Sequence, residues 1–312
     1  MGVSASAPAK LILCGEHAVV YGRPAIALPL DGVRAVATVE PAPAGMELQI
    51  LAPDLGAAWF VSGLPDHPLS ELTMATLRYL DLGLPQLTIT LRAQIPVASG
   101  MGSGAAIATA LVRALASYAG RTLTPAEQAN LVYGSERRFH GTPSGIDSTV
   151  VAYERAIWFQ RRDPTPRIEP ITIGQPLRLL VGDTGIRSAT HLPVGAVRKK
   201  WQADPPRYEA IFDAIGALAL QVRAALAAGA APELGMLLNE NQRLLVELGV
   251  SSPELERLIA AANGAGALGA KLSGAGWGGV MLALVTAERA PDVATALRAA
   301  GAVRLLETMT PA

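Results

Sequence analysis

The sequence predicts an α+β fold, in which strands and helices are interleaved without the regular rhythm of a parallel βαβ protein. Residues 87–92 alternate Leu and Ile with polar side chains, which is typical of a strand with one buried face. The glycine-rich segment 96–104 follows, and after it Ile107, Leu111 and Leu115 recur at the spacing of a buried helix face. A strand, a glycine turn and a helix are therefore expected in direct succession.

The other elements follow from weaker alternation and from turn residues. Alternating segments predict strands over 33–40 and 47–50. A connector rich in prolines and charged residues, 161–170, marks a domain boundary, which we place between residues 165 and 166. Beyond it the sequence predicts, in order, a strand at 177–181, a polar loop at 183–191, helices near 207–228 and 233–248, a helix after Ser252-Pro253, a glycine turn at 274–279 and a strand at 280–285.

The start of one helix is defined by its capping residues. Thr124 at the N-cap, Pro125 at the first helical position and Glu127 at the third form a capping box. We expect this helix to run to about Phe139 and then to break into the segment 140–147.

Charge and composition exclude several classes of protein. The 312-residue chain carries 26 basic and 26 acidic residues, which argues against nucleic-acid binding. Half of its residues are hydrophobic, yet the apolar segments 105–119, 214–228 and 279–287 are interrupted or shorter than the roughly 20 residues of a membrane-spanning helix. The single cysteine, Cys14, excludes an intramolecular disulfide framework and a cysteine-based zinc site. Because the N-terminus has no pattern of a secretory signal, we expect a cytoplasmic enzyme.

Two glycine-rich segments are candidates for phosphate binding. The turn 96–104 leads from a strand into a helix N-terminus, where backbone N–H groups and the positive end of the helix dipole favour an anion. It matches neither the Walker A pattern nor G-x-G-x-x-G in a parallel βαβ unit, and a purely steric turn explains it equally well. The segment 271–279, taken alone, is more simply a structural turn. Two such loops beside an acidic candidate for a metal favour a nucleotide site.

Three ionisable side chains stand out near these loops. Glu136 and Asp147 flank the predicted end of the capped helix, and phosphoryl transfer requires an oxygen ligand for Mg²⁺ and a carboxylate near the attacking hydroxyl. The alternatives are a solvated helix position for Glu136 and a helix cap or Asx-turn for Asp147, although an unpartnered carboxylate among the apolar neighbours of Asp147 is costly. Lys10, at the edge of a predicted strand, is either a group that stabilises a transferred phosphoryl group or an edge lysine with a solvated head.

Four segments together resemble the GHMP kinase superfamily, which comprises galacto-, homoserine, mevalonate and phosphomevalonate kinases. Residues 7–27, with the string GEHAVVYG, closely resemble the first motif of the mevalonate kinase family. Residues 96–106 resemble the superfamily's phosphate loop, and residues 271–279 its third motif. Residues 136–147 are similar to the mevalonate kinase segment that carries a Mg²⁺-binding Glu and the catalytic Asp. The resemblance covers nearly the whole chain.

The resemblance implies two domains. It implies an N-terminal domain like ribosomal protein S5 domain 2 over residues 1–165 and a ferredoxin-like C-terminal domain over residues 166–312. ATP and substrate would lie in the cleft between them. In part of the family the last strand returns to the N-terminal domain, and the same is open here.

The same resemblance assigns roles residue by residue. Asp147 would accept the proton of the substrate hydroxyl, Lys10 would lower the pKa of that hydroxyl, and Glu136, with Ser103, would hold Mg²⁺. The phosphates of ATP are expected at Pro96, Ala98, Ser99, Gly100, Met101, Gly102, Ser103, Gly104 and Ala105. The substrate is expected at Glu16, His17, Thr184, Arg187, Ser188 and Thr190. Gly274, Gly276 and Gly278 would support the phosphate loop.

One position departs from the family pattern. The phosphate loop usually reads Gly-Ser-Ser-Ala, and the second Ser, which is credited with contacting Mg²⁺, is Gly104 here. Ser103 or a water is the expected replacement, since Mg²⁺ keeps several waters in most protein sites.

The activity implied by the resemblance is ATP- and Mg²⁺-dependent phosphorylation of the primary hydroxyl of mevalonate, a step of isoprenoid biosynthesis. The implied partners are small molecules only, and a homodimer is left open. One alternative is a sister kinase that acts on phosphomevalonate or another small hydroxylated acid, for which Arg187, Arg198, Lys199 and Lys200 supply cations. The other is a non-catalytic sensor of ATP and a metabolite, which Gly104 weakly favours.

Overall fold

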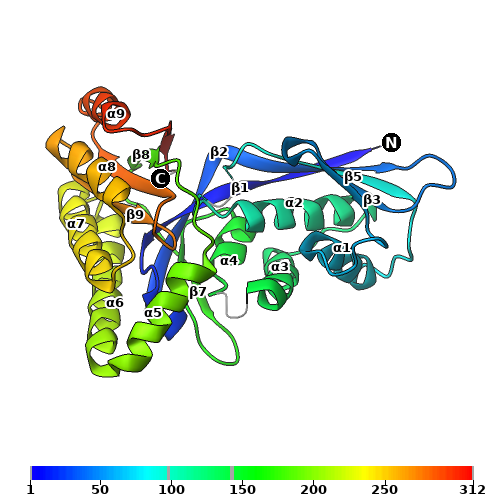
Figure 1. Cartoon of the computed structure of the whole chain (residues 1–312), viewed down its shortest axis with the longest axis horizontal. Coiled ribbons are helices and arrows are strands. Elements are labelled where there is room, and N and C mark those ends of the chain that lie inside the picture. The colour runs from blue at the N-terminus through cyan, green and yellow to red at the C-terminus, as the bar shows by residue number, and fades with distance from the viewer. Residues whose placement is uncertain (1, 97–98, 141–143, 311–312) are drawn as a thin grey trace. The chain divides into compact units, whose positions relative to one another are not determined.

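The chain forms an α+β fold built on two sheets, as predicted from its sequence (Figure 1). The computed structural model describes residues 2–96, 99–140 and 144–310. Its contacts divide the chain into two compact units: a first unit, Met1–Ala9, Asp31–Pro96 and Gly102–Glu154, and a second unit, Lys10–Leu30, Val97–Met101 and Arg155–Ala312.

This division differs from a linear one at residues 165–166 because two long strands each contribute to both units. These strands are β1 (Val3–Cys14) and β2 (Pro24–Pro41), and they pair with each other. The units are described separately below.

The sheet of the first unit runs in the order β4-β3-β5-β2. In β5 (Leu87–Ala93), Leu87, Ile89 and Leu91 are buried while the residues between them are partly or fully exposed, so the predicted strand at 87–92 is confirmed. The strand predicted at 33–40 is part of β2, and the one predicted at 47–50 begins two residues later, as β3 (Gln49–Ala52). The edge strand, β4 (Ala57–Phe60), pairs antiparallel with β3.

The helices of the first unit are α1 (Pro68–Tyr79), α2 (Ser103–Tyr118), α3 (Pro125–His140) and α4 (Ile146–Tyr153). Helix α2 packs against the other three helices and against β5, which its small alanine side chains allow. The capping box of α3 is confirmed: the Glu127 N–H donates to Thr124 Oγ1 at 3.3 Å, and the Thr124 N–H donates to Glu127 Oε2 at 2.7 Å. Short 3₁₀ turns lie at Ala18–Tyr21 in the second unit and Pro53–Leu55 in the first.

In the second unit, β6 (Ile157–Gln160) pairs with the first residues of β2, and β7 (Arg167–Pro170) pairs with β6. A second, antiparallel sheet has the order β11-β8-β10-β9 and comprises β8 (Arg178–Asp183), β9 (Gly269–Ser273), β10 (Val280–Val285) and β11 (Arg304–Met309). All residues of β10 are buried, which explains its unbroken apolar run. The final strand β11 pairs with β8 and therefore does not return to the N-terminal domain.

The helices of the second unit are α5 (His191–Ala203), α6 (Pro205–Ala228), α7 (Ala231–Leu248), α8 (Pro253–Gly264) and α9 (Ala290–Ala299). Helices α7 and α8 pack on β9, and α9 packs on β8 and β11. Helix α6 is the one helix among the described residues that is long and apolar enough to cross a membrane, whereas no membrane-spanning helix is expected from the sequence. Half of its apolar window is buried in the fold, where α6 packs against α5 and α7, so it is a core helix.

Candidate active site

Lys10 is the first residue of the part of β1 that belongs to the second unit, and the strand is buried there. Its side chain is only 2% exposed, and its backbone N–H donates to the Met101 carbonyl at 3.0 Å. The interpretation of Lys10 as an edge lysine with a solvated head is therefore wrong. This hydrogen bond joins β1 to Met101, which is the last residue of the phosphate loop within the second unit.

Glu16 and Lys271 form an ion pair in which neither side chain is exposed to solvent. Lys271 Nζ also donates to the Leu272 carbonyl at 2.6 Å, whereas Glu16 Oε2 has no hydrogen-bond partner among the described residues. Burial raises the pKa of Glu16 above its usual range, and the positive charge of Lys271 opposes that rise. The pair connects the first motif to β9, so Glu16 is engaged by the protein itself and its expected contact with substrate stays a prediction.

His17 has a backbone conformation that few non-glycine residues adopt, with φ of 60°. Its Nε2 lies 2.9 Å from the carbonyl oxygen of Ala275, and burial lowers its pKa to about 4. A carbonyl only accepts, so Nε2 carries the hydrogen and Nδ1 of the neutral ring is an acceptor. At neutral pH, His17 is therefore suited to bind a donor such as a substrate hydroxyl.

The glycine turn between β9 and β10 packs directly on the phosphate loop within the second unit. A Cβ at Gly279 would lie 2.6 Å from the Ser99 carbonyl oxygen, and one at Gly274 would lie 3.1 Å from Gly100 Cα. Real Cβ atoms do not approach backbone oxygen so closely, so Gly279 cannot carry a side chain without moving the loop. Gly276 instead faces Val250 and Gly278 faces Ile186.

The loop after β8 carries the other expected substrate residues. The Thr184 hydroxyl donates to the Gly279 carbonyl at 2.8 Å, which joins this loop to the glycine turn. The Arg187 guanidinium forms two hydrogen bonds, of 2.7 and 2.8 Å, with the buried carboxylate of Asp183. Arg187 is thus already oriented by an internal carboxylate. Ser188 is half-buried and Thr190 is exposed at the start of α5, where its side chain makes no capping hydrogen bond.

The first unit holds the rest of the expected phosphate site at the N-terminus of α2. Gly102 is the N-cap, with φ of 71°, and Ser103, Gly104 and Ala105 form the first turn without an acidic side chain. Backbone N–H groups of a first helical turn lack partners within the helix and suit a phosphate. A Cβ on Gly104 would meet nothing within 4 Å, so neither space nor a positive φ requires glycine there. Pro96 is half-buried, and Ala98 lies outside the described residues.

Glu136 and Asp147 lie on two helices that pack against each other, α3 and α4. Both side chains are half-buried, and Asp147 is in the first turn of α4, where the helix dipole favours a negative charge. The N-cap is Gly145, so the interpretation of Asp147 as a cap is wrong. Residues 141–143 of this motif lie outside the described part of the chain.

A carboxylate and a hydroxyl are hard oxygen donors of the kind that Mg²⁺ prefers, so Glu136 and Ser103 fit that ion chemically. In the part of the chain that the structure describes, no group of three His, Cys, Asp or Glu side chains is arranged to hold a metal. Magnesium in nucleotide sites takes its other ligands from phosphate oxygens and water, which is consistent with so few protein ligands.

Two polar residues of this region, Lys271 and Asp183, were missed as site candidates. Each lies in an apolar strand, β9 or β8, where a charged side chain is unusual. That contrast is the signal that identifies them, although it does not reveal that their partners are Glu16 and Arg187.

Comparison with known proteins defines the class first. The model of the GHMP kinases N terminal domain matches residues 71–155, and the model of the GHMP kinases C terminal region matches residues 222–303. The fold agrees: the crystal structure of L. major mevalonate kinase in complex with R-mevalonate superposes with a TM-score of 0.83, at 29% identity over 99% of this chain and 95% of that one. The chain therefore has the fold and the sequence features of a GHMP kinase.

Full-length relatives then narrow the class. A mevalonate kinase of Thermococcus sibiricus is 35% identical over 98% of this chain and 96% of its own length. One of Pyrococcus horikoshii is 35% identical over 97% of this chain and 94% of its own. The Methanococcus jannaschii mevalonate kinase, at 24% identity, shares the fold with a TM-score of 0.84 over 100% of this chain and 98% of that one. The chain belongs to the mevalonate kinase family of the GHMP kinases.

Proposed function

We propose that this protein transfers the γ-phosphoryl group of ATP to the primary hydroxyl of mevalonate and so forms 5-phosphomevalonate. The observation that carries the proposal is the 35% identity to mevalonate kinases over practically the full length of both chains. Two features of the chain support it: the buried Lys10 near the start of the first motif, and Asp147 in the first turn of a short helix.

In the proposed mechanism, Asp147 accepts the proton of the substrate hydroxyl as that oxygen attacks the γ-phosphorus of ATP. Lys10 stabilises negative charge that develops on the transferred group. The amides of the 99–105 segment orient the phosphates. Mg²⁺ carried by the nucleotide, with Glu136 and Ser103 as protein ligands, would supply further positive charge.

Recognition of the substrate is proposed to depend on hydrogen-bond polarity as well as charge. Neutral His17 accepts a hydrogen bond from a hydroxyl group of the substrate through Nδ1. Arg187 binds the substrate carboxylate with the N–H groups that Asp183 leaves available, because a guanidinium has five donors in a fixed plane. Thr184, Ser188 and Thr190 are proposed to line the same substrate region.

The test measures ADP release with Mg²⁺-ATP against mevalonate, phosphomevalonate, homoserine and galactose. We expect turnover with mevalonate and with none of the other three acceptors. Turnover with one of the other acceptors and not with mevalonate would refute the assignment of mevalonate as the substrate. No turnover in a protein that binds ATP would favour a sensor instead. Asp147→Asn should keep the fold and lose most of kcat, whereas the matched change at an exposed aspartate, Asp292→Asn, should leave kcat unchanged.

Two further points are proposed with this function. The protein acts in the cytoplasm, where ATP is present and a single free thiol stays reduced. Its sequence-family domains divide near residues 165–166. Light scattering at micromolar concentration distinguishes a monomer from a homodimer.

A further inference from the structure

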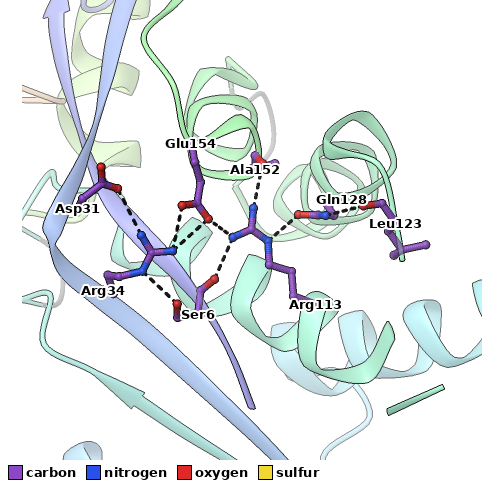
Figure 2. Close-up of polar contacts among 8 residues, drawn as sticks. All are labelled: Ser6, Asp31, Arg34, Arg113, Leu123, Gln128, Ala152 and Glu154. Carbon is purple, nitrogen blue, oxygen red and sulfur yellow. Dashed lines mark hydrogen bonds and ion pairs between the residues drawn. The ribbon is translucent and has the colours of Figure 1, made fainter. Parts of the chain in front are cut away.

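Figure 2 shows a polar cluster in the first unit that surrounds the end of α4. Glu154, which follows the last residue of α4, accepts hydrogen bonds from two arginines. Arg34 of β2 donates to both carboxylate oxygens at 3.0 Å, and Arg113 of α2 donates to Oε1. None of these residues belongs to the motifs that define the family resemblance.

Arg113 differs from Arg34 in what else it binds. Its guanidinium donates to the Ala152 carbonyl in the last turn of α4 at 2.9 Å and to Gln128 Oε1 of α3 at 2.7 Å (Figure 2). It also donates to the Ser6 carbonyl of β1 at 2.9 Å. Arg34, by contrast, donates to Asp31 of β2 and to the Ser6 hydroxyl of β1, besides Glu154. Of these two arginines, Arg113 alone donates hydrogen bonds to both α3 and α4.

The three helices joined by Arg113 are the helices that carry the expected catalytic groups of the first unit. Helix α2, which contains Arg113, begins at Ser103 of the phosphate loop; α3 carries Glu136, and α4 carries Asp147. Ala152 lies five residues beyond Asp147, or about 7.5 Å along the helix at 1.5 Å per residue.

Helix α4 depends on such contacts for its position. It has eight residues, and helices of that length are not stable in isolation, so tertiary contacts hold it in place. At its start, the hydroxyls of Ser148 and Thr149 donate to the Gly145 carbonyl. At its end, Arg113 satisfies a carbonyl that has no partner within the helix, and a cation there is favoured by the helix dipole.

We propose that Arg113 is a positioning residue for phosphoryl transfer: one guanidinium sets the relative placement of the phosphate-loop helix, the Glu136 helix and the Asp147 helix. The proposal rests on the function proposed above. A lysine cannot replace Arg113. The planar guanidinium holds several N–H donors in fixed directions, whereas an ammonium group is a single compact donor centre that cannot reach acceptors on α3, α4 and β1 together. Misplacement of Asp147 by about 1 Å is enough to cost on the order of 100-fold in rate.

The experiment compares Arg113→Lys with the matched variant Arg34→Lys, in the full-length protein. Both changes keep the charge and disturb the same carboxylate, but only the first removes contacts to α3 and α4. For Arg113→Lys we expect kcat and the single-turnover rate to fall about 10- to 100-fold, with KM for ATP and mevalonate within roughly threefold of wild type. Arg34→Lys should lose a similar amount of thermal stability and keep its kcat.

A purely structural role predicts a different result. Equal kcat in the two variants, or a folded Arg113→Lys protein with the wild-type rate, overturns the proposal. If Arg113→Lys does not fold, Gln128→Met removes the link from Arg113 to α3, together with the hydrogen bond that Gln128 Nε2 donates to the Leu123 carbonyl, and leaves the Arg113 contacts with α4 and β1 in place. We expect a lower kcat and a higher Mg²⁺ concentration for half-maximal rate, and wild-type values overturn the proposal. A wild-type protein without activity on mevalonate refutes the proposed function and this inference together. An active wild type, with Arg113→Lys and Gln128→Met variants whose kcat is unchanged, refutes the inference alone.

Discussion

Replacement of Lys271 by methionine tests how strongly the buried ion pair contributes to the fold. The substitution keeps an unbranched side chain of similar length and removes the positive charge. Glu16 Oε1 then loses its contact with Lys271, and Glu16 Oε2 already lacks a partner among the described residues. Because burial raises the pKa of Glu16 and Lys271 is the main opposing influence, the carboxylate becomes still less stable in its ionised form.

The expected loss of unfolding free energy is about 3–5 kcal/mol near neutral pH, the usual cost of removing one partner of a fully buried pair. That is a large share of the roughly 5–15 kcal/mol by which a domain is stable. The loss should shrink as the pH falls, because the folded-state pKa of Glu16 is raised and protonation removes the buried charge. The double variant Glu16→Gln/Lys271→Met removes both charges of the pair and should recover at least half of the loss.

Urea unfolding, followed by far-UV circular dichroism at two pH values, measures these differences. Lys199→Met is the matched control, since Lys199 is exposed on α5 and its replacement should change the free energy by no more than about 0.5 kcal/mol. A loss below about 1 kcal/mol for Lys271→Met, or a double variant less stable than either single variant, would refute the reasoning.

Three other single residues have expected outcomes. The pKa of His17 is about 4 in the folded state and 6.5 in the unfolded chain, so the unfolded chain takes up the proton at a higher pH. The free energy of unfolding should therefore fall by about 3 kcal/mol as the pH drops from 6.5 to 4, and His17→Gln should lose that part of the pH dependence. Identical pH profiles for the two proteins would contradict this. Burial raises the pKa of Cys14 to about 12, so iodoacetamide at pH 8 should modify Cys14 only after unfolding in urea; rapid modification of the native protein would show that the thiol is accessible. Gly104→Ser meets no obstacle and should raise stability by about 0.3–0.5 kcal/mol through helix propensity, with half-maximal turnover at lower Mg²⁺; an unchanged Mg²⁺ requirement would mean that the missing hydroxyl is not a ligand in this protein.

Elements with strong local signals could be predicted from the sequence. The capping box at Thr124 and Glu127 identifies the start of α3, because both hydrogen bonds lie within four residues. The alternation in 87–92 identifies β5, since one face of that strand is buried. Helix α1 was missed because its N-cap is His67, a residue that seldom caps helices.

The sequence by itself determined the family, through its motifs, and the capping box that begins α3. Only the tertiary structure decided which charges are paired. Glu16 and Lys271 are 255 residues apart, and the burial that makes their pairing necessary arises only in the folded chain, where Ile12 of β1 and Ser273 of β9 are hydrogen-bonded. The same holds for Arg113, whose acceptors lie on three separate elements. Local hydrogen bonds and periodicity are encoded in neighbouring residues, whereas long-range pairing depends on the packing of the whole chain.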